Sequence, residues 1–258
     1  INVQPGTYAE DVTVSKRVTL VGAGNGASPA TSTILAPAAT GFTVTAGGSS
    51  AGTRLTIQNL RISGGSSTGI LLAGPGALAH ITVSNVVVTG GNTGLAVPET
   101  LSSLNDLVVD QCTFSSNAFN GIRIVGATVS TPYHSGGATL PRTGLVVSNT
   151  TFTANGISGS NNLGKGDLNF VNFNGSVTLS GLTVTSSNPI FSIQFHGLDT
   201  DGDGVAPGLL SAGTVSLSDV TVNGTTQEYT MLLQMYADVG GFSFSDVAFD
   251  VASKSGLT

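Results

Sequence analysis

Leu55-Thr-Ile-Gln-Asn59-Leu-Arg-Ile62 is one of seven copies of a short pattern that recurs along the chain. Each copy has alternating apolar and polar residues on both sides of one central residue, which here is Asn59. The other copies read Ile81-Thr-Val-Ser-Asn85-Val-Val-Val88, Leu107-Val-Val-Asp-Gln111-Cys-Thr-Phe114, Leu145-Val-Val-Ser-Asn149-Thr-Thr-Phe152, Val177-Thr-Leu-Ser-Gly181-Leu-Thr-Val184, Val215-Ser-Leu-Ser-Asp219-Val-Thr-Val222 and Phe242-Ser-Phe-Ser-Asp246-Val-Ala-Phe249. Alternation of this kind predicts half-buried strands, and its recurrence indicates a solenoid.

The central residue of each copy predicts a sharp bend between two short strands. It is Asn, Asp or Gly in six of the seven copies. These residue types tolerate positive φ, so the backbone can bend there at little steric cost. Gln111 fits this position poorly.

The apolar positions predict how the copies stack. The residues four before and three after the central residue are apolar in every copy, as in Leu55 and Ile62. The central residues are 26 apart from 59 to 85 and from 85 to 111, and a third short strand, such as Gly69-Ile-Leu-Leu72, fits between copies. Parallel crossovers are almost always right-handed. We therefore predict an all-β fold, a right-handed single-stranded parallel β-helix with three sheets and about eight rungs.

The bend pattern resembles that of the pectin lyase-like superfamily of parallel β-helix proteins, and it extends over nearly all of Val12 to Phe249. The opening Ile1-Asn-Val-Gln-Pro-Gly-Thr-Tyr8-Ala-Glu10 is similar to the first coil of pectin methylesterases and their relatives. That resemblance implies the fold rather than one activity.

Larger spacings between copies predict loop insertions near residues 126–143, 153–167 and 197–213 of one domain spanning 1–258. Because the chain begins inside the repeat pattern and solenoid ends need capping, we expect it to be a trimmed part of a longer protein. No signal peptide is visible in it. Abundant Ser, Thr, Gly and Asn suggest an extracellular or cell-surface protein.

Composition narrows the classes of partner. Eight basic and fourteen acidic residues give a net charge of −6, which argues against binding nucleic acid or anionic membranes. No apolar run is long enough to insert into a membrane. Cys112, the single cysteine, shares an inward column with Leu60 and Val86, so we expect a buried thiol.

A polar stripe on the third strands is the first candidate site. Alternation directs Arg123, Gln194, His196 and Tyr236 outward, together with Asn169 on the rung between the long loops. Tyr133 and His134 belong to the loop above. The stripe offers amide and guanidinium donors, with rings that stack on sugars, so it suits a polysaccharide; ordinary solvated sheet residues are the alternative.

Catalysis has weaker support in the sequence. Hydrolysis of a glycosidic bond requires two carboxylates, and only Asp167 lies beside the stripe. The motifs that carry the active sites of pectin methylesterases and pectate lyases are missing. A β-elimination is the alternative reaction, with Arg123, His196 or Tyr133 as the base.

Asp199-Thr-Asp201-Gly-Asp203-Gly204 resembles the first half of an EF-hand or dockerin-type loop, which predicts a calcium site formed by Asp199, Asp201 and Asp203. Leu210 stands where the twelfth-position acid is expected, so a plain acidic turn stays open as the alternative.

Two columns of hydroxyl residues form a third candidate surface. Thr113, Thr151, Thr183 and Thr221 lie two residues after the bend, and Ser115, Thr153, Thr185 and Asn223 lie four after it. Ice-binding β-solenoids present similar arrays, although Thr is also common on exposed strands.

The sequence as a whole favours a non-catalytic, adhesin-like β-helix that binds a polysaccharide or a partner surface. A polysaccharide lyase acting on uronides at the Arg123/His196 sheet is the alternative, and an ice-binding threonine array is a minor one. The oligomeric state is left open.

Overall fold

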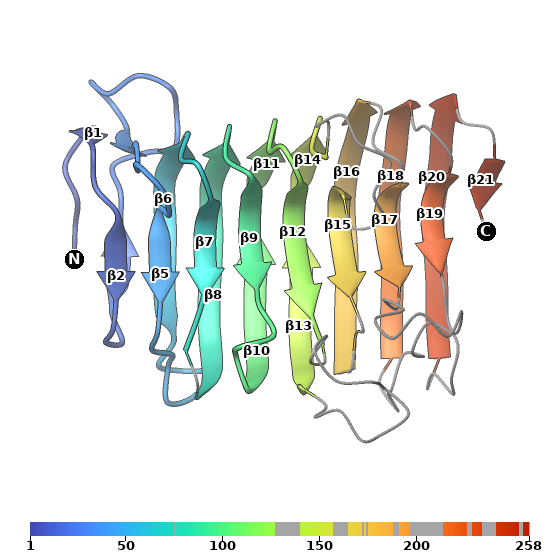
Figure 1. Cartoon of the computed structure of the whole chain (residues 1–258), viewed down its shortest axis with the longest axis horizontal. Helices are drawn as coiled ribbons and strands as arrows, with labels where there is room; N and C mark the ends of the chain where they lie inside the picture. Colours follow the sequence, from blue (N-terminus) through green and yellow to red (C-terminus); the bar gives the residue numbers. More distant parts are fainter. Residues whose placement is uncertain are drawn as a thin grey trace.

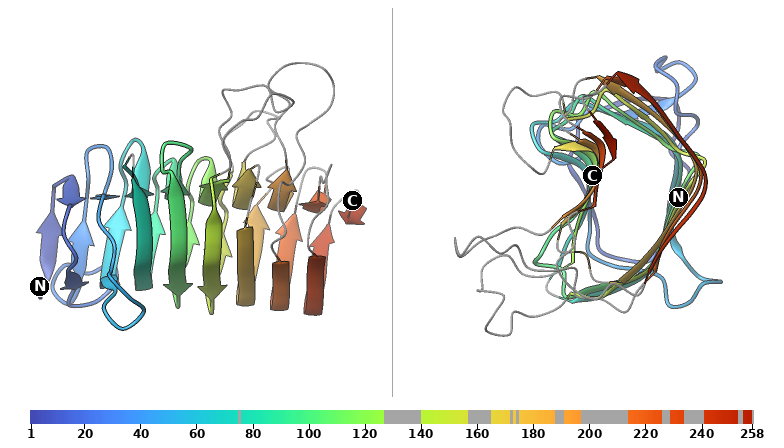
Figure 2. Two further views of the ribbon diagram at one scale, coloured as in Figure 1. Left: turned by 90° about the horizontal axis from the view of Figure 1, so that it is seen from below. Right: turned by 90° about the vertical axis from the view of Figure 1, so that its right-hand side faces the viewer.

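Short strands rich in Val, Ile, Leu and Thr stack in parallel along one axis, so that residues dozens of positions apart become neighbours (Figure 1). The computed structural model describes residues 1–74, 76–126, 140–156, 165–171, 173, 175–187, 191–196, 214–225, 229–233, 241–252 and 255–257. Every ladder between its named strands is parallel. Viewed along the axis, the chain winds around a central core (Figure 2).

The strands form two hydrogen-bonded sheets, here called sheet A and sheet B. Sheet A contains the twelve strands β1 (Gly6–Tyr8), β3 (Thr19–Val21), β4 (Thr33–Leu35), β6 (Leu55–Ser63), β8 (Ala77–Thr89), β10 (Ser103–Asp110), β11 (Thr113–Ser115), β13 (Arg142–Ser148), β14 (Thr151–Thr153), β16 (Gly175–Ser187), β18 (Thr214–Thr225) and β20 (Gly241–Ala252). Sheet B contains the nine strands β2 (Val12–Val14), β5 (Phe42–Val44), β7 (Thr68–Leu72), β9 (Thr93–Val97), β12 (Asn120–Val125), β15 (Gly166–Val171), β17 (Phe191–His196), β19 (Tyr229–Leu233) and β21 (Ser255–Leu257).

Sheet A is folded along the predicted line of bends, so that it presents two faces and the coil has three in all. All seven central residues have positive φ, from 47° at Asn149 to 61° at Gly181. Gln111 adopts φ 53° like the others, although its side chain is not one that favours this conformation. The stacking of the rungs therefore imposes positive φ on Gln111, although glutamine itself disfavours that conformation.

Two further lines of bends lie five residues before and five residues after the first. His80 and Asp106 have φ values of 55° and 61° on the earlier line. Gly90 and Ser116 have φ values of 77° and 54° on the later one. Corners at five-residue intervals turn the chain from one face of the coil to the next.

The core is a set of continuous columns of apolar side chains. Leu55 pairs with Ile81, and Ile81 pairs with Leu107, as the repeat predicts. The rings of Phe114 and Phe152 stack with centroids 5.5 Å apart, and those of Phe170 and Phe195 at 4.4 Å. Burial of these columns supplies the main hydrophobic stabilisation of the coil.

Cys112 lies in its expected inward column, with only 2% of its surface exposed. Burial raises the pKa of its thiol to about 12, so the thiol is protonated at neutral pH. The described residues include no helix that is long and apolar enough to span a membrane.

Candidate functional site

The polar stripe on sheet B has the register that the sequence predicts. Arg123 on β12 pairs with Asn169 on β15, which pairs with Gln194 on β17. On the next strand, β19, Leu232 pairs with Gln194. The three polar residues are therefore direct neighbours on successive rungs.

Two of these residues are not open to solvent, contrary to our expectation of an exposed floor. Asn169 and Gln194 are both fully buried. The side-chain amide Nε2 of Gln194 donates a hydrogen bond to the backbone carbonyl of Lys165, at the start of β15. Alternation predicts which face of the sheet a residue belongs to, but it carries no information about how far that residue is buried.

Among Arg123, Asn169 and Gln194, the members of the stripe whose side chains the structure describes, Arg123 keeps partial exposure. Burial lowers the pKa of its guanidinium, while the nearby carboxylate of Glu99 acts in the opposite direction. Arg123 is thus a partly desolvated cation on the outer face of sheet B.

Asp167, the predicted acidic neighbour of the stripe, has a structural environment. Its carboxylate Oδ1 accepts hydrogen bonds from the backbone N of Asn155 at 3.4 Å and from the side-chain Nδ2 of Asn155 at 2.9 Å. Asn155 Oδ1 in turn accepts a bond of 2.8 Å from Nδ2 of Asn117 one rung earlier. All three side chains are fully buried, so they form an internal polar ladder beside the later line of bends.

The remaining predicted site residues are not described. The backbone of His196 belongs to β17 and pairs with Val171, but its side chain lies outside the described part of the structure. Tyr133, His134 and Tyr236 also lie outside the described residues. The same holds for the proposed calcium ligands Asp199, Asp201 and Asp203.

An exposed aromatic ring lies just before β12 of the same sheet, where the sequence analysis did not place a site. Phe119 directly precedes β12 and is 39% exposed. Lys165 directly precedes β15, and its Nζ lies 5.0 Å from the ring centroid of Phe119. This distance is typical of a cation–π contact. The sequence shows that an aromatic residue stands just before this strand, but its exposure and its pairing with Lys165 follow from the stacking of rungs.

A second polar cluster lies on the earlier line of bends. The guanidinium of Arg54 donates to both carboxylate oxygens of Asp106, at 2.6 and 2.7 Å. His80 Nδ1 lies 2.6 Å from Oδ2 of the same carboxylate. The bonds from Arg54 are the largest factor that lowers the pKa of Asp106.

The repeat could have revealed this cluster. Arg54, His80 and Asp106 each stand five residues before a central residue, at 59, 85 and 111. Extending the columns to that position places the three in one line. Each is partly buried, so the cluster ties three rungs together at a corner of the coil.

A buried arginine holds another corner. Arg142, the first residue of β13, is fully buried. Its guanidinium donates to the carbonyls of Val125, Leu101 and Pro98 at 2.8, 2.8 and 3.2 Å. Burial lowers its pKa to about 10, which leaves it charged at neutral pH. Its guanidinium donates hydrogen bonds to carbonyl groups on two successive turns of the coil, so Arg142 has a structural role.

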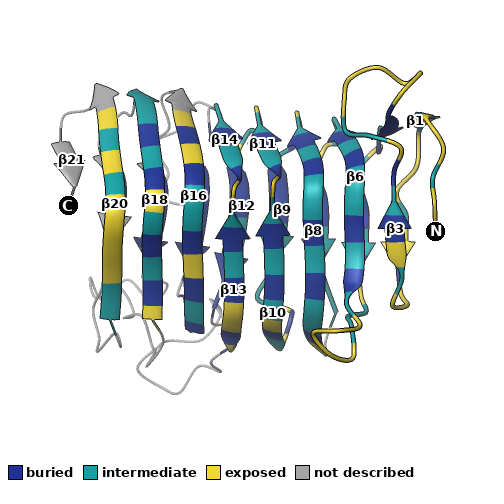
Figure 3. Cartoon of the chain, turned by 180° about the vertical axis from the view of Figure 1, so that it is seen from behind, coloured by how far each residue is buried: buried dark blue, intermediate teal, exposed yellow. Residues whose placement is uncertain are grey.

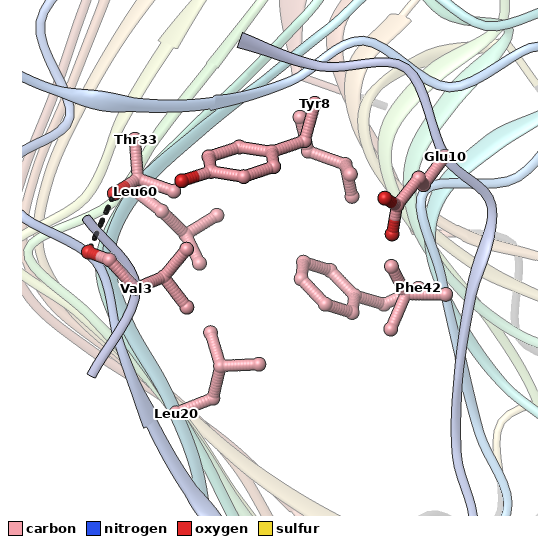
Figure 4. Close-up of a pocket in the computed structure, with 9 residues that line it drawn as sticks. Val3, Tyr8, Glu10, Leu20, Thr33, Phe42 and Leu60 are labelled. Atoms are coloured by element: carbon pink, nitrogen blue, oxygen red, sulfur yellow. Dashed lines mark hydrogen bonds between the residues drawn. The ribbon is translucent and has the colours of Figure 1, made fainter. Parts of the chain in front are cut away.

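A hollow of about 250 Å³ opens at the N-terminal end of the coil (Figure 4). Its walls include the side chains of Val3, Leu20, Phe42 and Leu60, and Tyr8 lies at one side. These are inward-facing residues of the first coils, so the hollow is the interior of the coil seen at its end. It lacks the several convergent polar groups that are typical of a ligand site.

No family model and no curated protein matches the chain. Among solved structures, the chain is similar to the catalytic domain of a GH87 alpha-1,3-glucanase in complex with tetrasaccharides, at 13% identity and a TM-score of 0.38. The alignment covers all of this chain and 61% of the glucanase domain. Pectate lyase Pel9A is similar at 14% identity and a TM-score of 0.44, with all of this chain and 69% of the lyase covered. The parallel ladders and the stacked strands give the described part of the chain an all-β, parallel β-helix fold.

Proposed function

We propose that the protein is an extracellular or cell-surface β-helix that binds a polysaccharide, or a polysaccharide-bearing partner, without cleaving it. The environment of Asp167 is the observation that carries this proposal. Its carboxylate is buried and bonded to Asn155, so it does not face a ligand on sheet B together with Arg123. A buried, hydrogen-bonded carboxylate stabilises the coil and is poorly placed to exchange protons with a substrate.

The exposed groups on this side of the molecule suit recognition of a sugar chain. The ring of Phe119 offers an apolar surface that a pyranose can cover. Lys165 lies beside the ring, and Arg123 lies four residues along the adjoining strand, about 13 Å away at the rise of a parallel strand. Cations next to a ring favour an acidic polysaccharide over a neutral one.

The test is binding of the 258-residue chain to immobilised acidic and neutral polysaccharides, with soluble products analysed in parallel. We expect retention on an acidic polysaccharide without release of fragments. Phe119→Ala and Arg123→Ala are each expected to weaken binding about tenfold, which corresponds to about 1.4 kcal/mol. Phe244→Ala is the matched control, because Phe244 is 47% exposed but belongs to sheet A. Equal binding by all variants would refute this site.

A polysaccharide lyase is the second candidate, and it is favoured by one observation. Burial lowers the pKa of Arg123, which moves a guanidinium towards use as a base. Incubation with acidic polysaccharides and Ca²⁺ would then produce the ultraviolet absorbance of unsaturated uronides. Absorbance that appears with the wild type and not with Arg123→Ala would replace the non-catalytic proposal with this one.

A further inference from the structure

The outer face of sheet A carries a regular array of hydroxyl side chains, which we call the hydroxyl face. It consists of Thr113 and Ser115 on β11, Thr151 and Thr153 on β14, Thr183 and Thr185 on β16, and Thr221 and Asn223 on β18. The ladders pair these residues in two columns over four consecutive rungs. The predicted array therefore exists as a two-dimensional arrangement on one side of the bend, and Figure 3 shows this face from outside.

The side chains of the hydroxyl face are not used within the protein. All eight are half-buried or exposed, and none of them donates or accepts a side-chain hydrogen bond in the described structure. Some hydroxyls on the other side of the bend are used within the protein. Ser148 Oγ donates to Asp110 at 2.7 Å, and Thr82 Oγ1 accepts from Arg54 at 2.6 Å. The side chains of the hydroxyl face are thus available to an external partner.

The chemistry of the hydroxyl face restricts the kind of partner. None of its eight residues is ionisable or aromatic, and the nearest charged residues in the same columns are Arg61 and Asp250 at its margins. A polyelectrolyte would find no counter-charge there. A soluble sugar chain would find neither a concave site nor a ring to stack on. The surface matches a partner that is neutral, flat and rich in hydrogen-bonding groups at fixed intervals.

Spacing within the hydroxyl face is set by the sheet itself. Neighbouring strands lie about 4.8 Å apart, and side chains two residues apart on a strand are separated by about 6.6 Å. These repeats are comparable with the oxygen spacings on faces of hexagonal ice. We infer that the hydroxyl face binds ordered water and adsorbs to an ice crystal, with its hydroxyls hydrogen-bonded to lattice water and its methyl groups seated between them. This activity is separate from the polysaccharide site on sheet B.

The experiment measures the shape of ice crystals and the inhibition of ice recrystallisation by the 258-residue chain at micromolar concentration. We expect faceted crystals and smaller grains than in a buffer containing an equal mass of albumin. Thr183→Tyr, at the centre of the array, is expected to reduce recrystallisation inhibition at least tenfold, because the ring prevents close contact with a flat lattice. The double variant Thr151→Val and Thr183→Val keeps the shape but removes two hydroxyls, and it is expected to show an intermediate loss.

Thr178→Tyr is the matched control. Thr178 lies on the same strand as Thr183 and is also exposed, but it stands on the other side of the bend at Gly181. Tyr is well tolerated on exposed strands, so both variants should fold, which circular dichroism and the melting temperature will verify. Ordinary round ice crystals with the wild-type protein would overturn the inference. Equal activity of Thr183→Tyr and Thr178→Tyr would overturn it too, and so would binding to a crystalline polysaccharide without any effect on ice.

Discussion

The side-chain amide of Asn155 donates a hydrogen bond of 2.9 Å to Asp167, and both residues are completely buried. The contact places a carboxylate inside the coil, where it continues a polar ladder that begins at Asn117. An acid that sequence spacing places beside a surface arginine is therefore part of the scaffold. Asp167 therefore belongs with the residues that stabilise the coil, whereas Arg123 stays a candidate binding residue on sheet B.

Asp167→Ala is expected to destabilise the coil by about 3 kcal/mol, because it removes the buried acceptor of two hydrogen bonds from Asn155, one from its backbone N and one from its side-chain Nδ2. Urea unfolding followed by circular dichroism measures this loss. Asp250→Ala, which removes an exposed carboxylate on β20, should change the free energy of unfolding by less than about 0.5 kcal/mol. Unchanged stability of Asp167→Ala would contradict a structural role.

Gln111→Asn is expected to stabilise the protein by about 1 kcal/mol, because Asn is more tolerant of the left-handed conformation found there, at φ 53°. The measurement is the same urea titration. Gln58→Asn is the control, since Gln58 lies on β6 and its φ is not positive. There we expect no gain. A destabilised Gln111→Asn would show that side-chain contacts of Gln111 outweigh its backbone strain.

Asp106 is expected to make stability depend on pH in the acidic range. Its pKa in the folded protein is lower than its ordinary value of 3.8, chiefly because of the hydrogen bonds from Arg54. The stabilisation is therefore fully present above that value and is lost as the pH falls through the lower, folded pKa. Asp106→Asn should flatten the fall in melting temperature below about pH 4.

The control for this titration is Asp250→Asn, which alters an exposed carboxylate distant from Arg54 along the coil. Its melting temperature should follow the wild-type curve through the acidic range. If Asp106→Asn followed that curve as well, the ion pair with Arg54 would contribute nothing measurable to folding.

Cys112 is expected to react with iodoacetamide only when the coil opens, because its thiol is 2% exposed and its pKa is raised to about 12. Mass spectrometry should detect negligible modification of the native protein at pH 8 and complete modification in urea. Rapid labelling of the native chain would indicate that the inward column at Cys112 is not closed. Free cysteine in the same buffer provides the reference rate.

Much of the fold could be predicted because one pattern repeats. Asn59, Asn85 and Asn149 occupy equivalent places in their copies, and equivalent places must lie on one line if each copy is one turn of a coil. The same argument correctly placed Cys112 inside and Thr151 outside. These assignments need only alternation and register, which are properties of the strands themselves.

The candidate sites could be predicted only in part. Register placed Arg123, Asn169 and Gln194 side by side, but the burial of Asn169 and Gln194 could not be read from alternation alone. The contact between Phe119 and Lys165 joins residues at the ends of strands, where no periodic pattern fixes the direction of a side chain. The distance between two such side chains depends on the backbone conformation of the corners that precede the strands.

The sequence by itself determined the winding, the inward columns and the neutral hydroxyl face, because a residue's place in a periodic strand fixes both its side of the sheet and its neighbours. The tertiary structure decided which polar groups are already paired within the protein. It buried Asp167 against Asn155 and joined Arg54 to Asp106, while leaving the hydroxyl of Thr183 unpaired. The physical reason is that hydrogen bonding and burial depend on distances of a few ångströms between residues far apart in the chain, and these distances are set when the rungs and corners pack.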